Sequence, residues 1–395
     1  MEKTRVGVIG CGNISDLYFM NLTERYGSEI EVVACADLYL ERAQASAAKW
    51  GFKAMTVEDL LKEESIEIVV NLTIPAVHTV VNRQILEAGK HCYCEKPLAL
   101  SFEDAKEIVA LAESKGLLIG CAPDTFLGAG FQTSRKLIDE GWLGKLVCGV
   151  ANMVCPGHEI WHPAPTFYYQ KGGGPMMDMG PYYMTALVSI LGPIKQISAF
   201  CCKGRDMRTI TSKPLRGTEK AKVAVEMPTT YQGIVEFESG ICVNVIMSFD
   251  IWNSELPRME IHGTEGSMYC SDPDNFMGPV YLTRGESIVD QFADMDTANF
   301  GVAGKNPFDY SELSKEMPLV QNDPRKKTRG LGVVDLAHAI RDGRKPRISH
   351  ELILHVIEAL CAFEKSSDAR EIYKMTTTCE RPAPIPVGLG LNCID

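Results

Sequence analysis

Short hydrophobic runs alternate with longer amphipathic segments in the first part of the chain. The runs are rich in Val, Ile and Ala, as buried strands are, whereas the segments between them space their apolar residues as helices do. The expected strands are residues 6–9, 31–36, 54–55, 66–71, 91–94 and 117–121. The expected helices are residues 13–25, 39–50, 57–62, 77–88 and 102–115, the last of them capped by Ser101. Strands that alternate with helices in this way predict an α/β domain with a doubly wound parallel sheet, the Rossmann arrangement.

The pattern changes after residue 125. One helix is expected at residues 128–140, and strand-like segments joined by short glycine-containing turns then predominate. These segments are residues 146–153, 195–202, 231–238, 241–249, 258–262, 266–270 and 280–283, followed by two helices at residues 331–341 and 351–365. Turns of this kind are typical of hairpins, so we expect a second domain of α+β type with a mostly antiparallel open sheet. The expected boundaries are 1–125, 126–378 and a Pro/Gly-rich arm at 379–395.

The composition narrows the class of protein. A chain of 395 residues is too long for one ordinary core, and 45% hydrophobic with 23% charged residues are globular values. The net charge of −11 argues against nucleic acid or an anionic membrane as a partner. No apolar run approaches the roughly 18–20 residues of a membrane span, and the first residues lead straight into a strand, so a cytoplasmic protein is expected. The 14 cysteines contain no CxxC pair, and no metal site is expected.

A glycine turn follows the first strand and opens the first helix. Its sequence is Gly10-Cys11-Gly12-Asn13-Ile14-Ser15. In a dinucleotide-binding turn the first glycine permits a tight bend, and the second lets a pyrophosphate approach the backbone at the helix N-terminus. Ser15 takes the place of the third glycine and is small enough for close packing of helix on strand. Gly10, Gly12, Asn13 and Ile14 are therefore candidate cofactor-binding residues.

Asp37 ends the second expected strand, 27 residues after Gly10. A carboxylate at this place can accept hydrogen bonds from the adenosine ribose and would repel a 2′-phosphate. We therefore expect NAD(H) rather than NADP(H) as the cofactor. The alternative interpretation is that Asp37 only caps the following helix.

Glu95-Lys96-Pro97 ends the expected strand 91–94. Because a dinucleotide fold binds its ligand at the carboxyl ends of the parallel strands, Lys96 is expected beside the reactive end of a nicotinamide. By itself the tripeptide is also compatible with a solvated charge pair.

The second domain contains a glycine-rich run, Gly172-Gly173-Gly174-Pro175, which Asp178 and Tyr182 follow. These last two residues are four apart, so on a helix they share one face and can point into one site. The alternative is a polar helix start with an aspartate near the positive end of the helix dipole.

Taken in chain order, these motifs resemble the family of glucose–fructose oxidoreductase, inositol dehydrogenase and MocA. The resemblance also includes Thr73-Ile74-Pro75 with His78, and it covers nearly the whole chain. It implies that the cofactor-binding set comprises Thr73, Ile74, Pro75, His78, Glu95 and Lys96 in addition to the glycine turn and Asp37. It also implies that Lys96 lies between nicotinamide and substrate, and that Asp178 and the residue four positions later complete the site.

The chain departs from this family at Tyr182, where a histidine is usual and acts as the acid/base. We expect tyrosine to do this work with a lowered pKa, because the ammonium of Lys96 and oxidised nicotinamide favour the phenolate. His158 and His162, in a loop-like segment after a second-domain strand, offer another route. Trp161 and residues Phe167, Tyr168 and Tyr169 add aromatic faces of the kind that sugar rings favour. The alternative for each of these residues is ordinary packing or a surface position.

These observations predict an NAD-dependent dehydrogenase for a secondary hydroxyl of a sugar, polyol or glycoside, with a small-molecule carbohydrate substrate. Two alternatives stay open. One is an NAD-dependent glycosidase that oxidises a ring carbon transiently and eliminates the aglycone. The other is a non-catalytic NAD-binding sensor, against which the presence of Lys96 and Asp178 argues. A homo-oligomer, dimer or tetramer, is expected because an open antiparallel sheet needs a cover on its second face.

Overall fold

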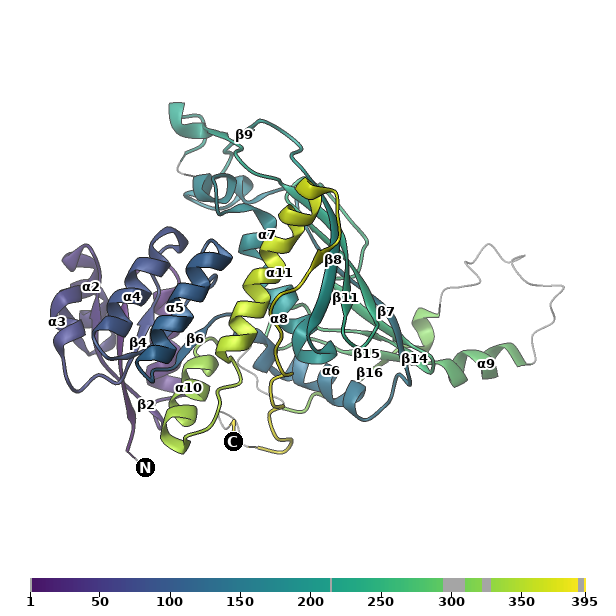
Figure 1. Cartoon of the computed structure of the whole chain (residues 1–395), viewed down its shortest axis with the longest axis horizontal. Coiled ribbons are helices and arrows are strands. Elements are labelled where there is room, and N and C mark those ends of the chain that lie inside the picture. Colours follow the sequence, from purple (N-terminus) through teal and green to yellow (C-terminus); the bar gives the residue numbers. More distant parts are fainter. Residues whose placement is uncertain (1, 214, 294–309, 322–327, 390–393) are drawn as a thin grey trace.

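The computed structural model describes residues 2–213, 215–293, 310–321, 328–389 and 394–395. An α/β unit formed by the first part of the chain lies beside a large twisted sheet formed by the second part, and long helices run between them (Figure 1). Among the residues that the structure describes, none of the helices combines the length and the apolar composition that a membrane span requires.

The first sheet is parallel and has six strands in the order β3-β2-β1-β4-β5-β6. Its strands are β1 (Thr4–Ile9), β2 (Ile30–Ala36), β3 (Lys53–Met55), β4 (Ile68–Asn71), β5 (His91–Cys94) and β6 (Ile119–Cys121). Its helices are α1 (Ser15–Met20, continued by a π-turn at Asn21–Arg25), α2 (Leu40–Trp50), α3 (Val57–Lys62), α4 (His78–Glu87) and α5 (Phe102–Ser114). The doubly wound α/β domain predicted from the sequence is confirmed. As expected, the Ser101 hydroxyl caps α5 by accepting from the Asp104 N–H at 3.1 Å.

The second sheet has nine strands in the order β16-β15-β14-β13-β7-β12-β11-β8-β17. Neighbours are antiparallel except β7 and β12, which run parallel, so the mostly antiparallel sheet is also confirmed. The strands are β7 (Leu146–Val154), β8 (Ile194–Cys202), β11 (Thr230–Phe237), β12 (Cys242–Ser248), β13 (Met259–Gly263), β14 (Gly266–Tyr269), β15 (Tyr281–Arg284), β16 (Lys315–Glu316) and β17 (Tyr373–Lys374). Two further strands, β9 (Met207–Thr209) and β10 (Lys222–Ala224), form a separate small ribbon.

Helices cover one face of the second sheet (Figure 1). The helices of this half are α6 (Ala129–Asp139), α7 (Gly174–Asp178), α8 (Gly180–Leu191), α9 (Gly285–Ala293), α10 (Leu331–Asp342) and α11 (His350–Ala369). α11 is fixed to β8 through Ser366 and Ser367, whose hydroxyls accept from the N–H groups of Ala199 and Cys201. On the opposite face Phe200 is 63% and Ile234 is 49% exposed.

The chain returns to the first sheet before β17, the last strand of the second sheet, is formed. The N–H groups of Gly330 and Gly332 donate to the buried Asp124 carboxylate at 2.9 and 3.0 Å. Gly332, in α10, lies so close to the Tyr93 ring of β5 that an added Cβ would be 2.4 Å from its hydroxyl. This contact places Arg329, two residues before α10, at the boundary between the two halves. The domain boundaries expected from the sequence stay a prediction.

Candidate active site

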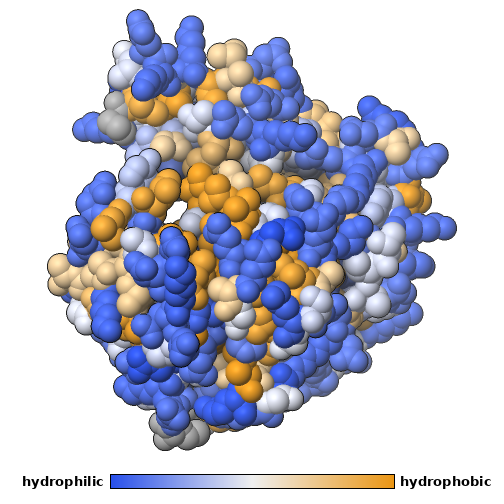
Figure 2. Space-filling view, turned by 60° about the vertical axis from the view of Figure 1, so that its left-hand side comes forward, coloured by the Kyte–Doolittle hydropathy of each residue, from blue (hydrophilic) through white to orange (hydrophobic). Residues whose placement is uncertain are grey.

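Lys96 lies two residues after the end of β5, at the carboxyl edge of the parallel sheet. The Lys96–Pro97 peptide bond is cis. The lysine lies on a cavity of about 160 Å³ between the two halves of the molecule. The cavity is lined by Ile74, Pro75, Ala76, Lys96, Pro97, Leu100, Phe167, Tyr168, Gln170, Lys171, Gly172, Gly173, Met177 and Asp178. Most of this wall is apolar, and hydrophobic residues also surround an opening in the space-filling view (Figure 2).

Asp178 forms an ion pair with Lys96 in the wall of the cavity. The lysine Nζ donates to Asp178 Oδ1 at 2.8 Å and to the Asp178 backbone oxygen at 2.7 Å, and both side chains are about 85% buried, at 15% and 14% exposure. Burial by itself lowers the pKa of Lys96, but Asp178 raises it above its ordinary value. Burial likewise raises the pKa of Asp178, but Lys96 and His158 bring it below its ordinary range. The pair is therefore ionised, and Asp178 accepts from two of the three N–H groups of the ammonium.

His158 contacts the second oxygen of the same carboxylate. Its Nε2 lies 3.0 Å from Asp178 Oδ2, and its Nδ1 accepts from the Trp161 indole N–H at 3.2 Å. A neutral imidazole that carries its proton on Nε2 satisfies both contacts. Asp178 thus joins the lysine of the first domain to a histidine that precedes the second domain's glycine run.

Tyr182 lies near Lys96 but does not share a continuous helix with Asp178. α7 ends at Asp178, Met179 interrupts it, and α8 begins at Gly180. The Lys96 ammonium is 5.1 Å from the centre of the Tyr182 ring. The predicted proximity of Asp178 and Tyr182 therefore arises from two short helices in succession.

The pKa of Tyr182 departs from its ordinary value in the direction opposite to our expectation. The side chain is 4% exposed, and burial raises its pKa to about 12 although Lys96 and Arg329 act to lower it. The sequence suggested the nearby cation but gave no measure of the desolvation, which has the larger effect. Tyr182 thus carries its proton at neutral pH.

Arg329 is a site residue that the sequence did not indicate. Its Nη2 donates to the Tyr182 hydroxyl oxygen at 2.9 Å and to Asp274 Oδ1 at 3.3 Å, and its Nη1 lies 3.6 Å from Glu95 Oε1. It is 147 residues from Tyr182 and follows the basic run 325–327, which by itself predicts a solvated surface. Only the packing of α10 on the first sheet brings it to the site.

Glu95 is held away from the cavity by its own contacts. Its Oε1 accepts from the Tyr18 hydroxyl at 2.8 Å, and its Oε2 accepts from the Lys96 N–H at 3.0 Å. The residue is 7% exposed. Its side chain therefore fixes the backbone at Lys96.

The glycine turn has the space that a dinucleotide requires. Gly10 has a φ of +104°, and an added Cβ would lie 2.6 Å from the Leu72 carbonyl, so only glycine fits there. An added Cβ at Gly12 would meet nothing within 4 Å, and this open side of the turn is where a pyrophosphate would lie. Ser15 is buried and its hydroxyl donates to the Gly12 oxygen at 2.7 Å. Asn13 is exposed and Ile14 half-buried at the start of α1.

Asp37 faces this turn. Its Oδ2 accepts from the Cys11 N–H at 2.8 Å and its Oδ1 from the Tyr39 N–H at 3.0 Å. α2 begins after Tyr39 without a side-chain cap. The carboxylate therefore joins the end of β2 to the glycine turn, and next to it Leu38 is 86% exposed at the edge of the sheet.

The segment 73–75 follows β4 and forms part of the cavity wall. Ile74 is 66% exposed and lines the cavity together with Pro75. Thr73 is fixed by Asn71, whose side-chain oxygen accepts from its hydroxyl at 2.6 Å. His78 is fully buried, and its ring nitrogens lie 2.7 Å from the Pro97 oxygen and 3.0 Å from the Thr73 oxygen. It thus holds two cavity segments together rather than facing the cavity.

His162 belongs to an aromatic group and has no hydrogen bond to Asp178. Its ring packs edge-on against Trp161, Phe167 and Tyr168, at centroid distances of 5.3, 5.6 and 5.3 Å. Its Nδ1 accepts from the Ala164 N–H at 3.1 Å, and burial lowers its pKa. Of the two histidines predicted near the site, the structure places His158 on the carboxylate. Tyr169 is buried behind them and donates to Glu159.

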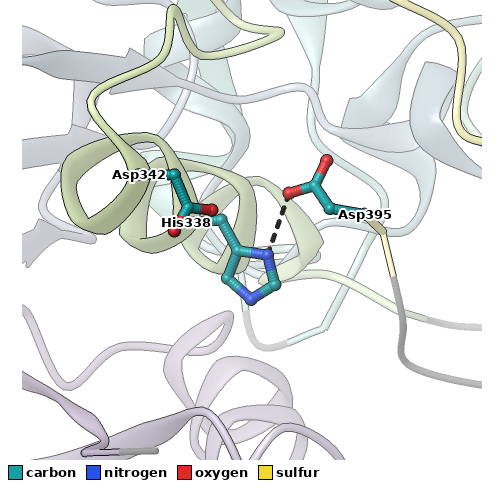
Figure 3. Close-up of side chains that lie close together, drawn as sticks. All are labelled: His338, Asp342 and Asp395. Carbon is teal, nitrogen blue, oxygen red and sulfur yellow. Dashed lines mark hydrogen bonds and ion pairs between the residues drawn. The ribbon is translucent and has the colours of Figure 1, made fainter.

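A group of potential metal ligands lies away from this site. His338, Asp342 and Asp395 bring their ligand atoms within 4.8 Å of one another (Figure 3). Arg344 and Arg347 also contact the Asp395 carboxylate, at 2.5 and 3.0 Å, and Arg341 contacts Asp342. Because arginines already compensate these carboxylates, the cluster is best described as an ion-pair network.

Known proteins match both halves of the chain. Residues 4–122 match the oxidoreductase family's NAD-binding Rossmann fold, and residues 131–269 match the GFO/IDH/MocA C-terminal domain. The chain belongs to the GFO/IDH/MocA family of oxidoreductases. The resemblance noted in the sequence is therefore confirmed, and NAD is the cofactor of the Rossmann domain.

Individual relatives match between half and about two thirds of this family member. An uncharacterised oxidoreductase of Schizosaccharomyces pombe is 33% identical over 206 residues, which are 50% of this chain and 55% of that protein. The 1,5-anhydro-D-fructose reductase of Ensifer adhaerens is 27% identical over 271 residues, which are 67% of this chain and 74% of the reductase. The match to the first of these spans little more than half of the relative's length.

Solved structures extend the likeness of this family member to nearly the whole fold. Levoglucosan dehydrogenase in complex with NADH superposes with a TM-score of 0.75 at 17% identity, covering 95% of this chain and 100% of that chain. At this identity the likeness shows the fold alone.

Proposed function

We propose that this protein is an NAD(H)-dependent oxidoreductase that transfers a hydride between a nicotinamide and the carbon of a secondary hydroxyl in a sugar, polyol or glycoside. The observation that carries the proposal is the ionised Lys96–Asp178 pair on a cavity at the carboxyl end of β5. In a doubly wound sheet the ligand binds at this edge, where the strand order reverses.

The residues at this edge fit the cofactor. The open side of Gly12 would take the pyrophosphate, and Asp37 would accept from the ribose hydroxyls. Exposed Leu38 and Ile74 offer apolar surface for the flat rings. When bound, NAD supplies the hydride acceptor or donor for the substrate carbon.

Lys96 holds the reacting oxygen of the substrate. Two of its N–H groups point to Asp178, which leaves the third for a ligand in the cavity. An ammonium at this place stabilises the negative charge that develops on the oxygen when the hydroxyl carbon is oxidised. Asp178, fixed on its other side by His158, keeps the ammonium in this orientation.

Tyr182 is the proton-transfer residue. Its oxygen accepts from Arg329, so its own proton is free to be given to a substrate oxygen. Because its pKa of about 12 keeps the phenol protonated, it is suited to donate a proton to a carbonyl in the reductive direction. In the oxidative direction the phenolate takes the hydroxyl proton, and this step becomes faster as pH rises. His158 is the other group close enough to serve, through Asp178.

The substrate class is supported by the cavity wall and by a relative. Phe167 lines the cavity and is 41% exposed, and aromatic faces of this kind pack well against the C–H groups of sugar rings. Trp161, which donates to His158 outside the cavity wall, is 58% exposed and offers a second aromatic face. The reductase of Ensifer adhaerens acts, by its name, on an anhydro sugar. Lys171 and Gln170 add polar groups to the same wall.

The experiment that tests this function is a screen of NAD⁺ reduction, followed by absorbance, across cyclitols, free sugars and glucosides. We expect NADH to accumulate with at least one of these classes. Release of an aglycone while NAD⁺ stays constant would support the glycosidase instead. Binding of NAD(H) without turnover of any class would support the sensor. The cytoplasmic location and the homo-oligomer stay predictions.

A further inference from the structure

Among the described residues outside the candidate active site, Arg208 is the most deeply buried cation. It lies on β9 and is 2% exposed. Its Nη1 donates to the Pro156 oxygen at 2.9 Å and to Glu159 Oε1 at 2.8 Å. Its Nη2 donates to the Phe249 oxygen at 2.8 Å and to Asp250 Oδ1. One guanidinium thus joins two carboxylates and two backbone carbonyls.

The partners of Arg208 surround His158. Pro156 lies two residues before the histidine and Glu159 directly after it. The Phe249 ring packs against the imidazole with centroids 4.5 Å apart, and the Phe249 carbonyl is bound by the arginine. The guanidinium therefore fixes the backbone on both sides of His158 and also the aromatic residue that supports its ring.

Gly157 shows how tightly this loop is pressed onto the arginine. Its φ is +108°, and an added Cβ would lie 2.7 Å from Arg208 Nη1 and 2.6 Å from the Tyr169 hydroxyl. The residue before His158 must therefore be glycine for the loop to reach its place. The other oxygen of Glu159 accepts from that same Tyr169 hydroxyl.

The segment after β9 holds the loop a second time. The N–H groups of Thr211 and Ser212 both donate to the Glu159 backbone oxygen at 3.0 Å. The Ser212 hydroxyl donates to the His162 oxygen at 2.5 Å. The ribbon of β9 and β10, which projects from the large sheet (Figure 1), therefore contributes its side chains and backbone to the histidine loop.

We propose that Arg208 is a positioning residue for His158, and that the small β9–β10 ribbon exists to hold this histidine against the Asp178 carboxylate. The inference rests on the proposed function, because it assigns a catalytic consequence to the orientation of Lys96 and Asp178. Loss of Arg208 frees the loop 156–159, and His158 then leaves the carboxylate that orients the ammonium.

A lysine does not replace this arginine. Its ammonium is a single point charge with three N–H groups, whereas the planar guanidinium reaches acceptors on two sides. Arg208→Lys thus keeps the positive charge and removes some of the N–H groups that bind the acceptors on the two sides. A displacement of about 1 Å at a group that orients the reaction costs up to about 10²-fold in rate. We therefore expect Arg208→Lys to lower kcat by roughly 10- to 100-fold while the affinity for NADH changes less than about threefold.

The test is a double-mutant cycle with the best hydroxyl substrate of the screen. Wild type, Arg208→Lys, His158→Ala and the double variant are compared for kcat, KM and NADH affinity. If Arg208 acts through His158, Arg208→Lys has little further effect once His158 is absent. Equal losses of kcat in both backgrounds would overturn the proposal. If Arg208→Lys does not fold, Glu159→Gln, which keeps the shape and removes one charge, takes its place with the same expectation.

Arg347 supplies a matched control. It is 7% exposed and also donates to a buried carboxylate, Asp335 Oδ1 at 2.8 Å, and to backbone oxygens of residues 383 and 394. None of these contacts involves the loop 156–159 that carries His158. Arg347→Lys should lower the melting temperature to a similar extent and leave kcat unchanged. A kcat loss in Arg347→Lys equal to that in Arg208→Lys would show that Arg208 only stabilises the fold.

A measurement without turnover separates this inference from the proposed function. Nitrogen NMR of ¹⁵N-histidine protein, assigned with His158→Ala, reports which ring nitrogen of His158 carries the proton. We expect protonation on Nε2 in wild type and a mixture of tautomers in Arg208→Lys. An unchanged His158 signal in the variant would refute the positioning role. Failure of the substrate screen with the expected NMR change would refute the proposed function and leave the positioning intact.

Discussion

Replacing Tyr182 by phenylalanine removes one hydroxyl and keeps the ring that packs beneath Lys96. With a pKa of about 12, only about one phenol in 10⁵ is ionised at pH 7 and about one in 10³ at pH 9. If the phenolate is the base, kcat/KM for oxidation of the hydroxyl rises about tenfold for each pH unit over this range, because the fraction of phenolate does.

The assay follows NADH formation at saturating NAD⁺ from about pH 6 to pH 9.5. Tyr182→Phe should lose this rise and about 10²–10⁴ of the rate, the usual contribution of a proton-transfer group. The control is Tyr183→Phe, the same change at a neighbouring buried tyrosine whose hydroxyl donates to the Asn152 oxygen at 3.3 Å. This control should keep both the rate and its pH dependence.

A histidine base would give a different profile. Histidines titrate near about pH 6.5, so the rate would level off in the neutral range, and His158→Ala would carry the large loss. A Tyr182→Phe enzyme that retains more than about a tenth of the wild-type rate would refute the tyrosine assignment. A plateau above pH 7 in wild type would refute it independently.

Two further predictions concern the cofactor and the assembly. Calorimetric titration should show tighter binding of NAD(H) than of NADP(H). Asp37→Asn should narrow this difference in affinity by about tenfold, because one negative charge near the 2′-position is removed. Asp59→Asn on α3 is the control, and equal affinities of wild type for the two cofactors would contradict the role of Asp37. Light scattering of the full chain at micromolar concentration should return a multiple of 43.5 kDa, since Phe200 and Ile234 leave apolar surface on the uncovered face of the second sheet. A mass of 43.5 kDa would refute the homo-oligomer.

The sequence predicted the parts of the site that local patterns carry. Strand and helix periodicities placed Lys96 at the end of β5, and the position of Asp37 after β2 placed it beside the glycine turn. Asp178 could be found because it follows a glycine run and lies four residues before Tyr182. In each case the residues close by in the sequence determine the path of the backbone, and the fold then brings that segment to the site.

The sequence could not predict the contributions of distant segments. Arg329 reaches Tyr182 across 147 residues, and Arg208 reaches Glu159 across 49, through packing that no local pattern records. The predicted direction in which the pKa of Tyr182 departs from its ordinary value was wrong for a related reason. Desolvation depends on every group that packs around the phenol, and the sequence does not show these groups. His78 belongs to the predicted cofactor-binding set, but its side chain is fully buried and holds the backbone of the cavity wall instead of facing the cavity.

The central claim is that Lys96 acts in hydride transfer and not in holding the cofactor. The most direct test measures NADH formation and NAD⁺ affinity for Lys96→Ala beside wild type, with Lys106→Ala on the exposed face of α5 as the control. We predict that Lys96→Ala loses several orders of magnitude in turnover and binds NAD⁺ within a few fold of wild type, because we assign the ammonium to the reacting oxygen of the substrate and not to the cofactor. A Lys96→Ala protein with near-normal turnover would contradict the account.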